Sequence, residues 1–326
     1  MSAQVSKFIK TSICALALLC AASVAVAQTF PSRPITIVVG YTPGGQADAI
    51  ARAVAKGLSE NLKTPVIVEN KPGANGLISA QSVAKADPDG HTLVLVTDAM
   101  TTIDPQLPGS TRFDPAKALR PIVNMAKAPL FVAANKDVPA NSLSELIELG
   151  RKDPESLSFG TSGNATPHRM VGELLKQMGG FEMMHVPYKG TSAAVTNLAG
   201  GQIPLVIGGA GSLLPLVQAG RIKLLAVSSE QRFPPTPDVP AISETFKGFN
   251  MEVYMGLMAP KATPDSVVQT LNQEVNKVLT GPDVATILDP QGMIPVGGTP
   301  EDFQKQIEAD YQARGKIIRD LDIKAE

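Results

Sequence analysis

Two short loops of this sequence carry residue types that are suited to holding a small anion. Residues 42–48 and 160–168 are rich in glycine, hydroxyl and amide groups and contain few charges. Each loop precedes a segment with helical character. It should therefore lie at a helix N-terminus, where free N–H groups and the positive dipole end attract anions. Facing each other across a cleft, the loops would suit a small carboxylate held by backbone N–H groups, hydroxyl groups and water. The alternative is that each is only a tight turn in which glycine supplies a positive φ.

Catalytic and metal-binding constellations are scarce. None of the three histidines, His91, His168 and His185, has the H-x-x-H or H-E-x-x-H spacing of a metal site. Residues 160–164 resemble a nucleophile elbow, but Asn164 stands where the G-x-S-x-G pattern needs glycine. No phosphate-binding G-x-x-x-x-G-K-[ST] loop or dinucleotide G-x-G-x-x-G motif is present. We therefore expect no catalytic residue, no metal and no cofactor.

The N-terminus has the order of a cleavable signal peptide. Lys7 and Lys10 precede a short apolar run, and small residues at 25–27 precede Gln28. The apolar run is shorter than the roughly 20 residues that a membrane-spanning helix needs. We expect cleavage after Ala27 and a protein that works outside the cytoplasm.

The rest of the composition indicates a folded protein without disulfides. Both cysteines, Cys14 and Cys20, would leave with the signal peptide, so the remaining chain has no thiol chemistry. A lipid anchor on Cys20 is disfavoured because bulky Leu19 precedes it. The formal net charge of −1 gives no reason to expect nucleic-acid binding, which favours a strongly basic face. The 28 glycines and 27 prolines are read as tight connections, because apolar runs recur along the whole chain.

The elements that must position the two loops follow an alternating pattern. An apolar β-branched run at residues 35–39 predicts a buried parallel strand, and further strands are expected at 66–70 and 92–96. Helical patterns at 50–58 and 78–86 lie between them. This is a right-handed βαβαβ unit. The pattern restarts further on, with strands expected at 130–134, 157–159, 184–188, 205–207, 224–227 and 251–259, and helices at 142–151, from 167, at 193–198, 212–219, 264–279, 282–288 and 300–321.

Two successive α/β units and a late helical segment predict two lobes joined by two crossings. The crossings are expected near residues 127–130 and 250–254. The domains are then a signal peptide at 1–27, a first lobe at 28–127 and 252–326, and a second lobe at 128–251.

The chain resembles the Bug family of periplasmic solute-binding proteins, the receptors of tripartite tricarboxylate transporters. The resemblance rests on the combination, order and spacing of short motifs from about residue 30 to residue 300. They are PSRPI (31–35), PGGQAD (43–48), VENKPGA (68–74), DPDGHTL (87–93), GTSGN (160–164), VPYKG (186–190), PDVP (237–240) and GLMAP (256–260).

The resemblance implies a two-lobe periplasmic-binding-protein fold, the Venus flytrap, that closes on a small and usually carboxylated solute. It also implies a periplasmic location, delivery of the solute to the membrane components of a tripartite tricarboxylate transporter, and a monomer without nucleic-acid partners. The family's P-G-G-x-[TA]-D and G-[ST]-[AS]-G-N loops contact the ligand, often through water. Carried onto this sequence, the ligand-binding residues are Tyr41, Pro43, Gly44, Gly45, Gln46, Ala47, Asp48, Thr97, Asp98, Thr161, Ser162, Asn164, His168, Tyr188, Lys189 and Gly190.

Two positions depart from the family pattern. Pro204 follows Gln202 and Ile203 where the family commonly has aspartate, which removes an acidic group and a backbone donor. Asp98 occupies a variable position and is expected near the mouth of the site, where it would repel a second ligand carboxylate or attract an amino group; the alternative is a solvent-facing position at the rim.

Two other functions stay open from the sequence. One is an exported α/β hydrolase, against which stands the lack of a serine–histidine pair in a nucleophile context. The other is a solute sensor that feeds a signalling kinase. The identity of the ligand does not follow from the sequence.

Overall fold

A mixed β-sheet forms the centre of the fold in the computed structural model, which describes residues 30–110 and 113–324. Residues 33–324 belong to one compact unit. The signal-peptide prediction falls on residues that lie outside the described ones. No helix within the described ranges is long and apolar enough to cross a membrane.

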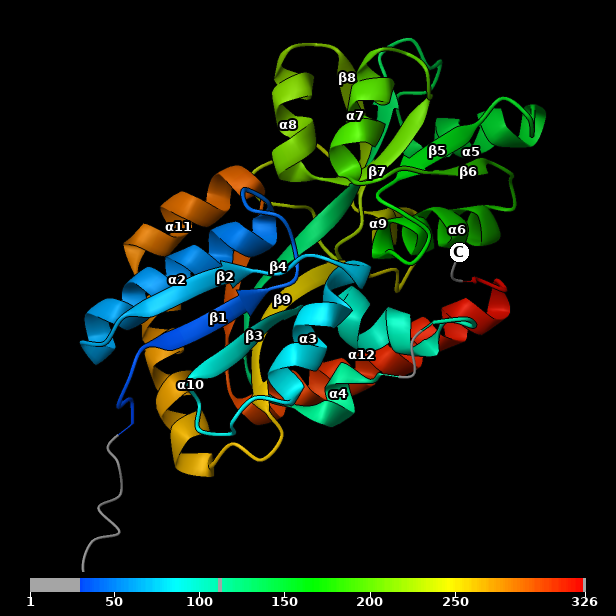
Figure 1. Ribbon diagram of the computed structural model, residues 1–326. Coiled ribbons are helices and arrows are strands. Elements are labelled where there is room, and N and C mark those ends of the chain that lie inside the picture. Colours follow the sequence, from blue (N-terminus) through cyan, green and yellow to red (C-terminus); the bar gives the residue numbers. More distant parts are fainter. Residues whose placement is uncertain (1–29, 111–112, 325–326) are drawn as a thin grey trace, which may run out of the picture. The chain divides into compact units, whose positions relative to one another are not determined.

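The strand order is β2-β1-β3-β9-β4-β7-β5-β6, with β10 and β8 also paired to β4 (Figure 1). β1 pairs in parallel with β2 and β3, and β5 pairs in parallel with β6 and β7. The strands are β1 (Ile35–Val39), β2 (Val66–Asn70), β3 (Thr92–Thr97), β4 (Leu119–Asn135), β5 (Ser158–Thr161), β6 (Met184–Pro187), β7 (Leu205–Gly209), β8 (Ile222–Val227), β9 (Glu252–Pro260) and β10 (Ile294–Gly297).

The central strands are the apolar runs that the sequence marks. In β1 the side chains of Ile35, Ile37 and Val39 are fully buried, as expected of a parallel strand covered on both faces. At the edge, β2 alternates partly buried and exposed residues, and Ile67 is exposed. The order of the predicted βαβαβ unit is therefore confirmed. Its bounds differ: β3 is one residue longer than expected, the first helix spans Gln46–Leu62 and the second spans Leu77–Ala84.

The two long strands β4 and β9 run where the sequence predicted crossings. β4 pairs with β9 over Leu119–Pro129 and then with β7 and β8 over 130–135, so the strand predicted at 130–134 is only its last part. Lys127 lies opposite Tyr254 in this ladder. The length of β4 was not predicted because Pro121 and Pro129 lie within it, and proline normally indicates the end of a strand. The ladder accommodates Pro121 with an irregularity in register between it and Val123.

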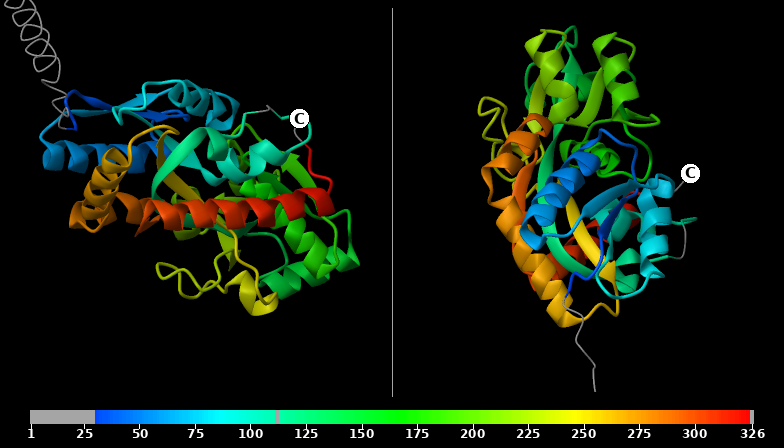
Figure 2. Two further views of the ribbon diagram at one scale, coloured as in Figure 1. Left: turned by 90° about the horizontal axis from the view of Figure 1, so that it is seen from below. Right: turned by 60° about the vertical axis from the view of Figure 1, so that its left-hand side comes forward.

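Helices pack around this sheet (Figures 1 and 2). α2 contacts β1 and β2, α3 contacts β3, and the long red helix α12 packs on β4; α6 and α7 contact β5 and β7. The helices are α2 (Gln46–Leu62), α3 (Leu77–Ala84), α4 (Pro115–Ala118), α5 (Leu143–Lys152), α6 (Pro167–Gly179), α7 (Thr191–Ala199), α8 (Ala210–Gln218), α9 (Ile242–Thr245), α10 (Asp265–Leu279), α11 (Pro282–Leu288) and α12 (Pro300–Asp320).

The start of α6 follows its sequence signals. The Thr166 side chain accepts a hydrogen bond from the backbone N–H of Arg169, and Pro167 occupies the first turn. Proline suits this position because its missing N–H would have no partner inside the helix. The predicted N-cap at Thr166 is confirmed.

Candidate functional site

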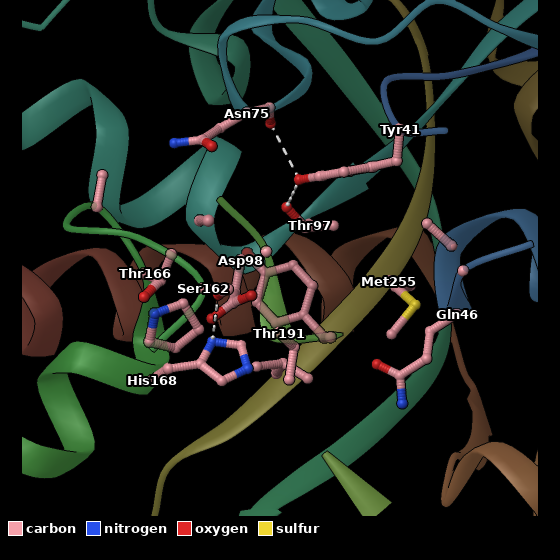
Figure 3. A pocket seen from close by; sticks show the side chains of 18 of the residues that line it. Tyr41, Gln46, Asn75, Thr97, Asp98, Ser162, Thr166, His168, Thr191 and Met255 are labelled. Carbon is pink, nitrogen blue, oxygen red and sulfur yellow. Dashed lines mark hydrogen bonds between the residues drawn. The ribbon is translucent and has the colours of Figure 1, made fainter. Parts of the chain in front are cut away.

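A cavity of about 560 Å³ collects residues from distant parts of the chain (Figure 3). Its size is in the range of small-molecule sites, which is about 300–1,000 Å³. The lining residues come from the loops before α2, α6 and α7, from the end of β3 and from β9. They are Tyr41, Thr42, Gly45, Gln46, Ala47, Asn75, Thr97, Asp98, Ala99, Ser162, Ala165, Thr166, Pro167, His168, Lys189, Gly190, Thr191, Val253, Tyr254 and Met255.

Two helices present uncapped N-termini to the cavity. α2 begins after Gly45 and α7 after Gly190, and no side chain caps either helix. Gln46 and Thr191, the first residues of these helices, line the cavity. Their first-turn N–H groups therefore have no side-chain acceptor, and an anion would supply one. Glycine at the caps also keeps side chains away from the approaching ligand.

Asp48 fixes the loop before α2 rather than facing the cavity. Its Oδ2 accepts hydrogen bonds from the Gly44 N–H, at 3.0 Å, and from Arg52 Nε, at 2.8 Å, while Oδ1 accepts from Asn70 Nδ2 at 3.0 Å. Burial raises the pKa of this carboxyl, but Arg52, Gly44 and Asn70 together hold its pKa below the ordinary value. Asp48, Pro43 and Gly44 are not among the cavity-lining residues. Asp48 acts on the site only by holding the backbone of the loop in place.

A polar network supports the side of the cavity next to β3. The Tyr41 hydroxyl donates to the backbone oxygen of Asn75 at 3.0 Å and bonds to Thr97 Oγ1 at 2.9 Å. Asn75, at a positive φ of 51°, donates to Asp104 Oδ1 at 3.3 Å. Burial raises the pKa of Asp104 to about 7, and its Oδ2 has no hydrogen-bond partner among the described residues.

Asp98 lies deep in the site. Its side chain lines the cavity, yet the residue is only 2% exposed, so the expected position near the mouth and the alternative at the solvent-facing rim are both wrong. The cause is the short π-helix η2 (Ala99–Ile103), which begins directly after β3 and buries Asp98 at its first turn. Burial raises the pKa of Asp98 to about 7; Arg314 opposes this shift and Asp310 adds to it.

The second loop combines a supporting residue with lining residues. Thr161 is fully buried, and its Oγ1 bonds to His185 Nε2 at 2.7 Å and to the Gly163 carbonyl at 3.0 Å, which holds the turn. Ser162 and His168 line the cavity, and Ser162 Oγ lies 3.2 Å from His168 Nδ1. Burial lowers the pKa of His168 to about 4, so its ring is neutral at neutral pH.

The Ser162–His168 contact corrects the sequence reasoning, which recognised no serine–histidine pair. The two residues are six apart and meet because the loop turns back over the first turn of α6. No carboxylate bonds to the His168 ring within residues 30–110 and 113–324, and burial is the one cause of its lowered pKa. The pair therefore lacks the acidic partner that orients a catalytic histidine.

Some of the remaining expected residues line the cavity and others do not. Lys189 is exposed and lines the cavity with Gly190. Tyr188 is half-buried and packs instead against the apolar cluster around Phe131 and Ala194. Asn164 is half-buried and is not a lining residue.

Several lining residues were absent from the expected set. Asn75 directly follows the VENKPGA motif (68–74) and was not among the expected ligand-binding residues. Val253, Tyr254 and Met255 belong to β9, whose continuous apolar pattern signals a core strand and not a site. A signal was available only at Thr191, because it follows the VPYKG motif and begins a helix.

Pro204 does not alter the cavity. It precedes β7, and its carbonyl accepts the backbone N–H of Asn135 at 2.9 Å. It is not among the lining residues of the cavity. No group of three or more His, Cys, Asp or Glu side chains placed to hold a metal ion occurs in the described part of the chain.

The mixed α/β fold and a cavity lined by loops and uncapped helix N-termini define a solute-binding protein. Residues 50–323 match the sequence model of the tripartite tricarboxylate transporter family receptor, and the chain belongs to this family.

Comparison with individual proteins agrees with this assignment. The protein BugT of Bordetella pertussis is 30% identical over 300 residues, which cover 91% of this chain and 92% of BugT. The solved structure of Rpa4515 from R. palustris with adipate has a TM-score of 0.82 and 32% identity, covering 90% of this chain and 99% of that one. The solved structure of MatC from Rhodopseudomonas palustris with bound malate has a TM-score of 0.77 and 27% identity, covering 89% of this chain and 100% of MatC. The expected Bug-family resemblance and two-lobe α/β fold are confirmed.

Proposed function

We propose that this protein is a periplasmic receptor that captures a small carboxylated organic solute between two lobes and delivers it to a tripartite tricarboxylate transporter. The observation that carries the proposal is the pair of uncapped helix N-termini, at α2 and α7, on one cavity. A ligand carboxylate would accept hydrogen bonds from their first-turn N–H groups, and the positive ends of both helices would favour its charge.

The family supports both the class of ligand and the partner. Two similar structures are described with adipate and with malate, both small dicarboxylates. The family description names a transporter receptor, which supports membrane components of such a transporter as the partner. We retain the lobe boundaries at 28–127 with 252–326 and at 128–251, since β4 and β9 run through both crossing regions. We also retain a monomer, and a role in binding rather than catalysis.

The ligand-binding test starts from protein purified from the periplasmic fraction. Mass spectrometry of the co-purifying solute should reveal a small carboxylate, and calorimetric titration should measure its affinity. Recovery of the protein in the cytoplasmic fraction, or turnover of generic ester substrates that depends on Ser162, would contradict the proposal.

A charge placed at the α7 N-terminus tests the proposed anion position. Thr191→Asp puts a carboxylate at the first residue of α7, and it should weaken carboxylate binding at least about tenfold through repulsion and occupation of the N–H groups. Thr196→Asp is the matched control, because it adds the same charge to the exposed face of the same helix. Equal affinities of the two variants would remove the α7 N-terminus from the ligand site.

A further inference from the structure

The carboxyl group of Asp98 is a buried polar group with an incomplete set of partners. It lines the cavity at 2% exposure, and no hydrogen bond reaches its Oδ2 from the described residues. Buried side-chain oxygens in native proteins are normally hydrogen-bonded, so an exception at a binding cavity calls for a functional explanation. Figure 3 shows Asp98 among the lining side chains.

The surroundings of Asp98 carry more negative than positive groups. Asp310 and Arg314 of α12 both act electrostatically on Asp98. Asp104 lies near enough to act, together with Asp98, on the Tyr41 hydroxyl. Three carboxyl groups therefore share this region with one guanidinium. Arg314 is 3% exposed and does not line the cavity, so its charge is not offered to a ligand.

The donor groups of the cavity belong to other elements. They include the first-turn N–H groups of α2 and α7, the exposed ammonium of Lys189, and hydroxyl and amide groups of other lining side chains. A solute that satisfied all these groups would carry a negative charge for the helix N-termini and a cationic hydrogen-bond donor for Asp98.

We propose that the solute is an amino-carboxylate, whose carboxylate lies at the N-termini of α2 and α7 and whose ammonium group donates to Asp98. The proposal rests on the carboxylate-receptor function above and narrows its ligand class. An ammonium group fits because it donates to the unpartnered oxygen and compensates the buried charge at once. A second ligand carboxylate at this place requires Asp98 to be protonated, and it adds another negative charge beside Asp104 and Asp310.

Matched probes test the assignment. The panel contains ω-amino carboxylates of increasing chain length, dicarboxylates of the same lengths and the corresponding unsubstituted monocarboxylates. Each is titrated calorimetrically into the wild-type protein and into the variants Asp98→Asn and Asp137→Asn. Asp137→Asn is the control, because it removes the same charge from an exposed position paired with Lys136.

The best amino-carboxylate should bind the wild-type protein at least about tenfold more tightly than the dicarboxylate of its length. Asp98→Asn should lose about tenfold to hundredfold in affinity for that probe, the range of a charge-assisted hydrogen bond, while Asp137→Asn should bind as wild type does. Tighter binding of the dicarboxylates, with amino-carboxylates unaffected by Asp98→Asn, would overturn the inference and leave the receptor function standing. Binding of none of the carboxylates would overturn both.

Proton exchange provides a second test on the wild-type protein alone. With its pKa raised to about 7, Asp98 is about half protonated at neutral pH, and an ammonium partner would lower that pKa. Binding of an amino-carboxylate should therefore release protons and strengthen as the pH rises from about 6 to 8. Calorimetric titrations in buffers of different ionisation enthalpy show whether protons are released or taken up on binding. Proton uptake would mean that a protonated Asp98 donates to the ligand, which overturns the ammonium assignment. Asp104, Asp310, Arg314, Tyr41 and Tyr254 share this region, and His168 and Lys189 line the same cavity, so other groups could also exchange protons. Asp98→Asn must therefore abolish the exchange, and Asp104→Asn must leave it in place, for Asp98 to be its source.

Discussion

At the residue scale, the pKa values of the buried carboxyl groups next to the cavity are shifted in opposite directions. Asp48 accepts hydrogen bonds from three groups, and its pKa lies below the ordinary value although burial opposes this. Asp98 and Asp104 are equally inaccessible but have few donors, and burial raises the pKa of each to about 7. Hydrogen-bond donors and the Arg52 charge hold the pKa of Asp48 down, whereas stronger desolvation with few donors raises the pKa of Asp98 and Asp104.

Asp104→Asn should stabilise the protein in a pH-dependent way. Because the pKa of Asp104 is raised in the folded state, its contribution to stability is fully present below about pH 4 and is lost as the pH rises through about 7. The amide keeps an oxygen that can accept from Asn75 Nδ2. The gain in stability of the variant over wild type should therefore be about 3 kcal/mol larger at pH 8 than at pH 4.5. Urea unfolding at both pH values measures this, and an equal gain at both would show that Asp104 does not titrate in this range.

Asp48→Ala should reduce stability and ligand affinity together. The change removes the acceptor of the Gly44 N–H and one of the two acceptors of Asn70 Nδ2, and the expected loss is about 2–4 kcal/mol. In the wild type the contribution of Asp48 is present above about pH 4 and is lost as the pH falls through its lowered pKa. Chemical unfolding and calorimetry provide the two readouts. Arg52→Ala is the comparison, since the Arg52 side chain is 52% exposed and its removal should have a small effect. A loss at Arg52 as large as that at Asp48 would assign the effect to the ion pair instead.

At the scale of elements, glycine sets how closely helices approach the sheet. A Cβ built at Gly172 of α6 would lie 2.2 Å from Phe159 of β5, and one at Gly256 of β9 would lie 2.1 Å from Phe303 of α12. These contacts are closer than any side chain tolerates. The two glycines therefore allow the close packing of α6, which carries His168, on β5 and of β9, which carries Tyr254, on α12.

Gly172→Ala should therefore destabilise the protein although alanine favours helices. The clash should exceed the helix-propensity gain of about 1 kcal/mol and leave a net loss of about 1–3 kcal/mol. Ligand affinity should also fall, because α6 would shift Ser162 and His168. The double variant Phe159→Leu/Gly172→Ala should recover part of both losses in melting and titration experiments. Unchanged stability in the single variant would mean that Phe159 moves aside freely.

At the scale of the whole molecule, the proposed receptor should change shape when it binds. With the proposed lobe boundaries, the ligand groups lie on two units joined through β4 and β9, and contacts made only in the closed state would favour closure. Small-angle scattering should show a smaller radius of gyration with a saturating carboxylate, for which malate and adipate are the first probes. An unchanged radius at saturation, measured beside the weakly binding Thr191→Asp variant, would contradict closure.

The sequence predicts the local parts of this structure well. The apolar runs at β1, β2 and β3, the helix starting at Pro167 and the cap at Thr166 all depend on neighbours within a few positions, so their patterns are visible in the chain. The length of β4 was missed because its prolines read as breaks, whereas pairing with β9 tolerates them.

The sequence predicted the loops of the candidate site and part of its lining, including Tyr41, Gln46 and His168, but not the role of every expected side chain. The sequence by itself determined that two glycine-rich loops precede helices and that few catalytic groups exist. Only the tertiary structure decided that Gly45 and Ser162 line the cavity while Asp48 and Thr161 support it from behind. It likewise decided the depth of Asp98 and the entry of β9 into the site. The physical reason is that burial and hydrogen-bond partners are set by contacts between residues far apart in the chain. Local periodicity shows only which face of a helix or strand a residue occupies and does not predict these contacts.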